Sequence, residues 1–448
     1  MIYVYILILF IAVIFSFKIN NGDYFNLSFL LIVGYFLSAI CCVYNIDEWA
    51  VDLHILTLVI LLIGIFSFII GSYFGRHIKK HIHYNKKTVS IYDVASRGEG
   101  YIKLLFVVAF DLIILFFLYR DIVRIASLNY VSWGNLFYNY RSNLGNEELG
   151  ANYSMIVDIG LRITKPLAYV YLFIFLTTLF NKSKKVKGIF PKLKKCLYCI
   201  PSLLYAVQVI IQGYRIQFIE LIVAGLFYLF YLFQQNHNWR GKLNYKIIRN
   251  FGIFFGAILV GFYYIKFFIG KLQESNGVLS YVTNYLGGSL QLFDMYLENP
   301  INKGHETFAA FINSFQKFDF FKGVDTVVQH EYRSASTGVY IGNVYTGFRN
   351  YYNDYWLFGV ILCSFALGFI FSYWYYYLRK VNHWTIGRIY SFLLYGYFLY
   401  SIVFHFFTDY FFALIGIGWM VNLLIFYGIV FLLFGVKFKK IKFRWKNG

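Results

Sequence analysis

Long uninterrupted apolar stretches are the feature that most constrains this chain. Eleven stretches of about 17 to 25 residues are long enough to cross a bilayer core of about 30 Å as helices. They lie near residues 1–17, 26–43, 55–74, 101–119, 155–180, 196–213, 216–233, 250–270, 354–378, 389–407 and 411–436. Because lipid leaves backbone polar groups no outside partner, the pattern predicts an all-α polytopic integral membrane protein with about 11 transmembrane helices.

The composition excludes a soluble fold. Hydrophobic residues make up 59% of the chain and charged residues 14%, against about 45 to 50% and about 25% in soluble domains. The net charge of +20 would suggest nucleic acid in a soluble protein. In a membrane protein, the same charge comes from Lys and Arg in cytoplasmic loops. We therefore expect membrane lipids as partners and no nucleic acid.

The basic segments set the predicted orientation. Alternating spans place them on one side, which is cytoplasmic by the positive-inside rule, with the N-terminus periplasmic and the C-terminus cytoplasmic. The basic segments are 77–87, 182–195, 240–249, 379–388 and the tail from 437. Three regions follow: residues 1–270 with eight spans and an arginine-bearing hairpin near 213–215, residues 271–353 as one large outer loop carrying short helices, and residues 354–448 with three spans and the basic tail.

Arginine is enriched on the predicted outer side, whereas lysine dominates the inner side. Topology requires positive charge of any kind, but a guanidinium grips phosphate or carboxylate in two places. The pattern favours an outward-facing site for a phosphorylated ligand, and a chance distribution is the alternative. The outer arginines are Arg120, Arg124, Arg141, Arg162, Arg215, Arg333 and Arg349.

Arg215 lies in the break between two long apolar spans, at the mouth of a predicted helical hairpin. A charge so close to hydrocarbon is costly unless it faces a cavity or a partner. Snorkelling of the side chain to lipid headgroups is the alternative. Glu220, farther along the second helix, is either the counter-charge of Arg215 or part of the cavity. Asp158 and Arg162, at i and i+4, predict an ion pair on a helix surface.

Residues 342–354 combine Arg349 and Asp354 with amide side chains and tyrosines, including Tyr345 and Tyr352, at a predicted membrane interface. Tyrosine is common at interfaces for amphipathic reasons. Together with an arginine, however, aromatic rings can stack on sugars while the guanidinium holds phosphate. This segment therefore predicts a platform for a carbohydrate phosphate.

Two His-Glu pairs in the large loop, His305-Glu306 and His330-Glu331, offer general-base candidates. Solvated histidines without a catalytic role are the alternative, and neither pair belongs to a HExxH zinc motif. The sequence also contains no P-loop, GxGxxG or GxSxG motif. An outward-facing enzyme of this kind would need a substrate already activated on a lipid.

Residues 343–360, NVYTGFRNYYNDYWLFGV, resemble the signature of bacterial oligosaccharide repeat unit polymerases, the Wzy-type O-antigen or capsular polysaccharide polymerases. Asn343, Tyr345, Thr346, Arg349, Tyr351, Tyr352, Asp354 and Gly359 fill the positions of that pattern, and Asn350 stands where proline is expected. The span count, Arg215 in its hairpin and the late outer loop also fit the family.

The resemblance implies a metal-independent glycosyltransferase of the bacterial inner membrane, without a cofactor. Its donor and acceptor would be oligosaccharides linked to undecaprenyl pyrophosphate, and a chain-length regulator protein would be a further partner. It implies diphosphate binding by Arg215, Arg349 and Arg141, with substrate contacts from Tyr345, Tyr352 and Arg333. His330, His305 or Asp354 would take the acceptor proton. An O-antigen ligase, a lipid-linked oligosaccharide flippase and a glycan acyltransferase are the competing interpretations.

Overall fold

The computed structural model describes residues 1–20, 22–78, 88–131, 135–146, 148–181, 195–239, 277–301 and 303–436, and the single residues 241, 249, 261, 263 and 264. Its helices are α1 (Ile2–Ile19), α2 (Leu27–Tyr44), α3 (Ile46–Trp49), α4 (Ile55–His77), α5 (Ile91–Gly98), α6 (Tyr101–Leu128), α7 (Leu136–Asn143), α8 (Met155–Phe180), η2 (Leu197–Cys199), α10 (Ile200–Gln212), α11 (Arg215–Asn236), α13 (Val278–Glu298), α14 (Ala309–Gln316), α15 (Gly347–Arg379), α16 (Ile386–Phe398), α17 (Tyr400–Val403), η3 (Phe412–Leu414) and α18 (Ile417–Phe434). Strands β1 (Arg333–Ser334) and β2 (Tyr340–Gly342) form an antiparallel hairpin.

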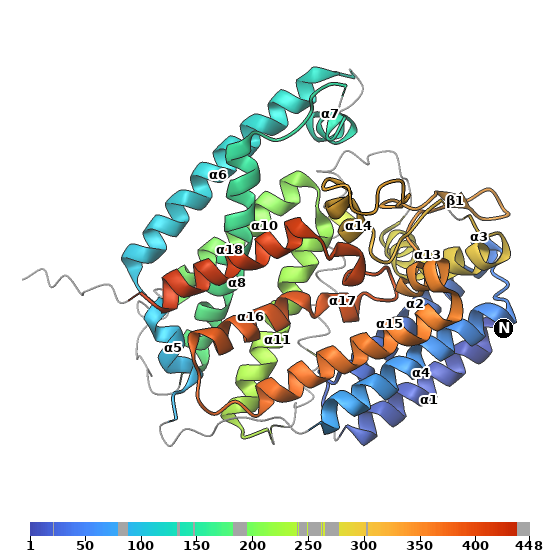
Figure 1. The fold of residues 1–448 in the computed structure, drawn as a ribbon, viewed down its shortest axis with the longest axis horizontal. Helices are drawn as coiled ribbons and strands as arrows, with labels where there is room; N and C mark the ends of the chain where they lie inside the picture. Colours follow the sequence, from blue (N-terminus) through green and yellow to red (C-terminus); the bar gives the residue numbers. More distant parts are fainter. Residues whose placement is uncertain are drawn as a thin grey trace, which may run out of the picture.

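The predicted all-α, multi-pass membrane architecture is confirmed (Figure 1). Within the described ranges, nine helical segments are long and apolar enough to span a membrane: α1, α2, α4, α6, α8, α11, α15, α16 with α17, and α18. The predicted span at 196–213 is a shorter apolar helix, Leu197–Gln212. The predicted span at 250–270 falls almost wholly outside the described residues.

Helices α4 and α15 pack with their backbones in close contact. A Cβ atom added to Gly71 or Gly75 of α4 would collide with backbone atoms of α15, and one added to Gly368 would collide with the backbone of α4. Small residues let membrane helices approach closely, which gains van der Waals contact where no hydrophobic effect drives association. This pair anchors one half of the bundle.

The two ends of the bundle differ in what they carry (Figure 1). At one end, which we call the basic end, the turn after α1 meets the end of α15 through an ion pair between Asp23 and Arg379 at 2.9 Å. Asn236 at the end of α11 donates to the carbonyl of Phe180 at the end of α8. The other end, which we call the loop end, carries α3, α7, α13, α14 and the β-hairpin. Residues 77–78 and 379–388, which are the described parts of two predicted basic segments, lie at the basic end.

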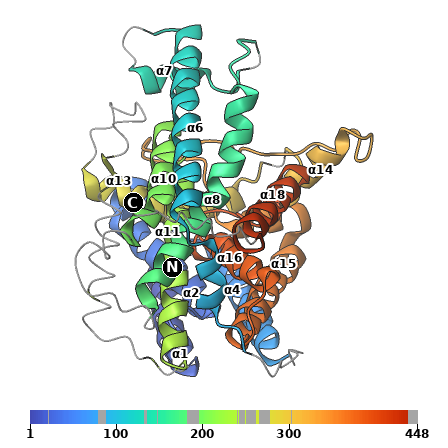
Figure 2. The ribbon, with the colours of Figure 1, turned by 90° about the vertical axis from the view of Figure 1, so that its left-hand side faces the viewer.

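Helix α6 is longer than predicted. The expected span stopped at residue 119, but α6 continues to Leu128, a length of about 42 Å at 1.5 Å per residue. Because this exceeds a bilayer core of about 30 Å, the last turns of α6 project past the other helices toward α7 (Figure 2). Arg120 and Arg124 belong to this projection. Apolar residues such as Ile122 and Ile125 are buried there against α7 and α8.

Helix α13 is the main feature of the large loop that hydropathy did not predict. Its 21 residues pack across α2, where a Cβ atom on Gly287 would come within 2.6 Å of the Cys42 backbone nitrogen. Asp294 then accepts from the backbone N–H of His54, just before α4. Polar residues spread along α13 lower its hydropathy, so an apolar-run criterion misses a helix that is half buried.

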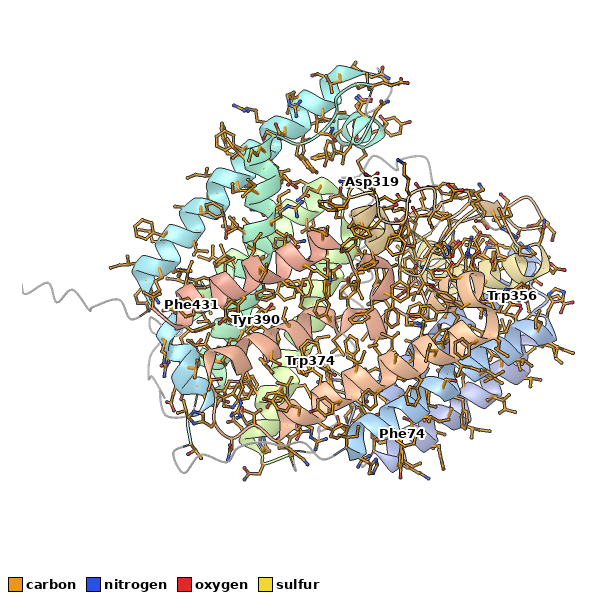
Figure 3. The ribbon with its side chains drawn as sticks, in the orientation of Figure 1. Phe74, Asp319, Trp356, Trp374, Tyr390 and Phe431 are labelled. Atoms are coloured by element: carbon orange, nitrogen blue, oxygen red, sulfur yellow. The ribbon has the colours of Figure 1, made fainter. Side chains whose placement is uncertain are left out.

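Exposed aromatic side chains line the perimeter of the bundle. Phe74, Trp356 and Phe431 lie at its outer edge (Figure 3). In a membrane these faces meet lipid, so part of the 23% aromatic content covers the outside of the bundle.

Candidate functional site

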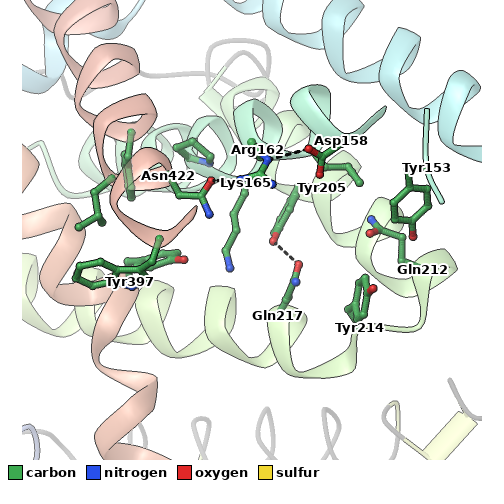
Figure 4. A pocket seen from close by; sticks show the side chains of 15 residues that line it. Tyr153, Asp158, Arg162, Lys165, Tyr205, Gln212, Tyr214, Gln217, Tyr397 and Asn422 are labelled. Carbon is green, nitrogen blue, oxygen red and sulfur yellow. Dashed lines mark hydrogen bonds and ion pairs between the residues drawn. The ribbon is translucent and has the colours of Figure 1, made fainter. Parts of the chain in front are cut away.

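A cavity of about 320 Å³ opens between α8, α10, α11, α16 and α18 (Figure 4). Its walls combine charged, amide and aromatic side chains, which are the groups that bind sugar hydroxyls and ring faces. The charged residues are Asp158, Arg162 and Lys165; the amides are Gln212, Gln217 and Asn422; the aromatics include Tyr153, Tyr205, Tyr214, Tyr397 and Trp419. Such a lining within apolar helices is costly unless it serves a ligand or solvent.

Lys165 is the charge nearest the middle of the cavity wall, and the sequence interpretation missed it. Its Nζ forms an ion pair with Glu220 Oε2 at 2.8 Å and lies 4.8 Å from the centre of the Tyr397 ring. Glu220 is therefore the partner of Lys165 and not the counter-charge of Arg215, which corrects one of the two predicted roles. The signal was present, since Lys165 is the sole lysine in the apolar stretch 155–180.

The local sequence of α8 explains why this helix can border a cavity near Lys165. Pro166 has no backbone N–H and cannot donate to the carbonyl of Arg162, four residues earlier. Arg162 forms the predicted i,i+4 ion pair with Asp158 at 3.1 Å, which is confirmed, and its Nη1 donates to Asn422 Oδ1 at 3.2 Å. Across the cavity, Tyr205 donates to Gln217 Oε1 at 3.1 Å. These hydrogen bonds hold polar side chains in the walls of the cavity and leave its interior open.

Arg141 and Arg215 stand beside the α10–α11 turn, whose Gln212 and Tyr214 line this cavity. We call these two residues the rim arginines. Gly213 adopts a positive φ of 75° there, and a Cβ atom on it would come within 2.6 Å of the Arg141 guanidinium. Arg141 donates to the Gly213 carbonyl at 3.3 Å. Arg215 donates to the Tyr281 hydroxyl and lies 5.6 Å from the Tyr285 ring centre. Glycine at 213 thus lets the arginine of α7 approach the hairpin.

The charges of the two rim arginines act on one another. The pKa of Arg141 is lowered because protein surrounds part of its guanidinium and because Arg215 carries the same charge nearby. In the part of the chain that the structure describes, no carboxylate lies within ion-pair distance of Arg141. A concentration of like charge next to a polar cavity favours an anionic ligand.

Arg349 has the opposite environment. Its side chain is 1% exposed, and its Nη2 forms ion pairs with Glu306 Oε1 at 3.1 Å and Glu331 Oε2 at 2.7 Å. The guanidinium lies over the Tyr345 ring at 3.8 Å and the Tyr296 ring at 4.4 Å. Two carboxylates and two rings therefore occupy the positions that a phosphate and a sugar would take in the predicted platform.

Glu331 connects this cluster to the end of α13. Burial raises its pKa, but the hydrogen bonds and charge of Arg349 outweigh that effect and leave the pKa lowered to about 2. Arg333 pairs with Glu331 at 3.0 Å and donates to the backbone carbonyls of Met295 and Asn299. Arg333 thus closes the end of a helix, where orphan carbonyls need donors.

The three predicted proton acceptors differ in access. Asp354 is 1% exposed on its side chain and accepts from the backbone N–H groups of Glu306 and Thr307. His330 is 10% exposed, with Nδ1 3.5 Å from Glu306 Oε1. His305 is 45% exposed and lies 3.8 Å from Asp354. His305 is therefore the one of the three that a bulky acceptor can reach.

The structure does not bring Arg215 and Arg349 together. Arg215 bonds to Tyr281 and Arg349 stacks on Tyr296, and these tyrosines stand about 22 Å apart along α13 at 1.5 Å per residue. One diphosphate cannot bridge that distance. The structure brings Arg215 together with Arg141, and Arg349 with Tyr345; Tyr352, half-buried, packs near Trp356. Whether each predicted residue binds substrate stays a prediction.

Sequence reasoning also missed His54, which stands just before α4. Its Nδ1 lies 3.0 Å from Asp294 Oδ2 and its Nε2 lies 3.3 Å from Glu298 Oε1. Hydrogen bonding to Asp294 and the charge of Asp294 raise the pKa of His54. The pairing links residues far apart in sequence, so no local pattern could reveal it.

Among the residues that the structure describes, no group of three or more His, Cys, Asp or Glu side chains is placed to hold a metal ion. Comparison with known protein families, with curated proteins and with solved structures finds no match to this chain.

Proposed function

We propose that this chain is a membrane-embedded glycosyltransferase that polymerises oligosaccharide repeat units linked to undecaprenyl pyrophosphate, on the outer face of the bacterial inner membrane. The observation that carries the proposal is the cavity between α8, α10, α11, α16 and α18, with Arg141 and Arg215 beside the α10–α11 turn that lines it. A lipid-linked sugar has an apolar tail, a diphosphate and a saccharide in sequence. The bundle offers a counterpart for each part: lipid-facing helices, an arginine pair and an aromatic, polar cavity.

In this proposal the rim arginines bind the diphosphate. Donors fixed before the reaction stabilise the charge that develops on a leaving pyrophosphate, an effect that commonly contributes several kcal/mol. Arg349 takes a different role from the one that the family resemblance implies. With both flanking carboxylates already paired to it, it holds the two loop segments of Glu306 and Glu331 together and does not touch phosphate.

The transfer itself forms one bond and breaks one. The acceptor hydroxyl oxygen attacks the anomeric carbon of the donor, the bond from that carbon to pyrophosphate breaks, and the lipid pyrophosphate leaves with its electron pair. The hydroxyl proton goes to a base. His305 is accessible, and its loop reaches the start of α18, where Ser314 Oγ accepts from the Ile417 N–H at 3.1 Å. Asp158, 54% exposed in the cavity wall, is the second candidate for this proton.

Two other functions use the same ligand. A ligase would pass the glycan to a lipid A core, and a flippase would move the lipid-linked unit without chemistry. Deleting the gene and separating surface glycan on a gel distinguishes them. A polymerase defect leaves a single repeat unit on the core, whereas loss of a ligase or flippase leaves no surface sugar.

Complementing the deletion strain with rim variants tests the site. Arg141→Lys and Arg215→Lys keep the charge but cannot make the bidentate hydrogen bonds of a guanidinium to phosphate. We therefore expect loss of the glycan ladder while the amount of the protein in the membrane stays normal. Arg120→Lys is the matched control, because Arg120 lies on α6 against the Phe117 ring and should restore a full ladder. Wild-type ladders from both rim variants would refute the proposed diphosphate site.

The base is tested in the same strain. His305→Gln and Asp158→Asn remove the two candidate proton acceptors, and one of them should stop chain extension. Ladders of wild-type length from both variants would exclude both residues as the base.

A further inference from the structure

A second cavity, of about 880 Å³, lies at the basic end of the bundle, away from the candidate site. Its lining residues come from the turn between α1 and α2 and from the ends of α4, α11 and α15. These ends lie at the same end of the bundle (Figure 1). Because four helix ends meet there, the cavity sits where membrane-spanning helices leave the hydrocarbon core. In a bilayer this is the level of lipid headgroups.

The lining of this basic-end cavity carries an excess of positive charge. Arg76, Arg379 and Lys380 face it together with a single carboxylate, Asp23. Asp23 is paired with Arg379 at 2.9 Å, and Arg76 donates to Asn20 Oδ1 at 3.1 Å. The lining thus holds three cations against one carboxylate. In the described ranges, the Lys380 ammonium makes no hydrogen bond or ion pair. An anionic group entering the cavity would meet cations from two helices.

Aromatic rings hold the guanidinium groups in place. The Arg379 guanidinium lies 4.4 Å from the Trp239 ring centre and 5.3 Å from that of Tyr376, and Arg76 lies 5.4 Å from Tyr376. Trp239 has a positive φ of 59°, a conformation that costs a non-glycine residue about 1 to 3 kcal/mol. A strained backbone that positions Trp239 against Arg379 is a built feature of this cavity.

The same lining also has an apolar part. Phe17 at the end of α1 and Phe230 on α11 line the cavity on the side of the helix interiors. A ligand that fits both parts has a negatively charged head and an apolar tail. Basic pockets between membrane helices typically bind the headgroups of anionic lipids.

We propose that the basic-end cavity binds the headgroup of an anionic phospholipid, with the phosphate between Arg76 and Lys380 and the acyl chains passing Phe17 toward the hydrocarbon. Bound there, the lipid joins the ends of α1, α4, α11 and α15. The proposal does not depend on the function proposed for the loop end, because the two cavities share no lining residue.

The test uses the full chain purified in mild detergent. Lipid affinity is measured by native mass spectrometry and by thermal shift with added phosphatidylglycerol or cardiolipin, and with phosphatidylcholine for comparison. We expect the anionic lipids to bind and to raise Tm, and phosphatidylcholine to do neither. Each cation removed from the cavity should weaken binding about fivefold. Lys380→Gln is the primary variant, since its ammonium has no partner to lose and the fold should survive; Arg76→Gln is the second.

Arg97→Gln is the matched control, because Arg97 is an exposed arginine on α5 outside the cavity lining. It should bind anionic lipid as wild type does. Equal binding of phosphatidylcholine, or equal loss in Arg97→Gln and Lys380→Gln, would overturn the proposal. A Tm rise of the same size with millimolar inorganic phosphate would also overturn it, because the cavity would then be a site for free phosphate and not for a lipid.

Discussion

The cluster around Arg349 and the surroundings of Arg141, beside the candidate-site cavity, contrast in charge compensation. Arg349 is buried between Glu306 and Glu331, whereas Arg141 is exposed and has the Gly213 carbonyl as its hydrogen-bond acceptor. A buried charge contributes to folding only when it is paired. An arginine without a local acid, placed beside a polar cavity, is available to an anionic ligand. Two arginines at the loop end of the bundle thus differ in role: Arg349 stabilises the fold, and Arg141 is available to a ligand.

Removing Arg349 should give the largest loss of stability. Arg349→Met leaves the buried Glu306 without its arginine and leaves Glu331 with Arg333 alone, and breaking a buried pair in this way costs about 3 to 5 kcal/mol. We expect a large fall in Tm or loss of the protein from the membrane. Adding Glu306→Gln and Glu331→Gln should restore much of the loss, which size-exclusion profiles after heating would measure. A stable, inactive Arg349→Met protein would instead show that Arg349 binds a ligand, and the proposed difference between Arg349 and Arg141 would be wrong.

Lys165 and Glu220 should give the next largest effect. Their pair is less enclosed, with 20% exposure of the Lys165 side chain, so either Lys165→Met or Glu220→Gln should cost about 2 to 3 kcal/mol. The double variant should cost less than the sum of the two, as a double-mutant cycle would show. Asp158→Asn is the control, because its exposed pair with Arg162 should be worth under about 1 kcal/mol. Additive losses from Lys165 and Glu220 would contradict their pairing.

Acid should weaken the Arg349 cluster. The folded-state pKa of Glu331 is lowered to about 2, below an ordinary value of about 4.3. Its contribution to stability is therefore present above the ordinary pKa and is lost as the pH falls from about 4.5 toward 2. Glu331→Gln should flatten the Tm profile in that window. An unchanged acid limb in this variant would show that Glu331 is not the titrating group.

The smallest effect concerns His54 and runs in the opposite direction. Asp294, Glu298 and Asp52 face His54, and hydrogen bonding to Asp294 raises its pKa. The stabilisation is complete below the ordinary pKa of about 6.5 and is lost as the pH rises through the higher folded-state value. Solvent screens this half-exposed pair, so the change should be slight. We expect His54→Gln to remove a small fall in Tm between neutral and alkaline pH. The same fall in the variant would rule out His54.

The spans were predictable because apolar length alone determines them in lipid. Helix α13 was not, since its core contacts depend on close packing of Gly287 against α2. Lys165 was readable as a lone charge in a span. The role of Arg349 could not be predicted from the sequence. Its two carboxylate partners, Glu306 and Glu331, each follow a histidine, and we therefore interpreted them as parts of general-base pairs. Nothing in local spacing distinguishes a compensated arginine from an available one.

The affinity of the purified protein for a short-chain lipid pyrophosphate carrying one sugar tests the account most directly. Arg141→Gln and Arg215→Gln should each raise Kd at least about tenfold, because a hydrogen bond to a charged group is worth about 1.5 to 3 kcal/mol. A folded triple variant, Arg349→Met with Glu306→Gln and Glu331→Gln, should bind as wild type does. Wild-type affinity in both rim variants, with binding lost in the triple variant, would place the diphosphate site at Arg349 and contradict the account.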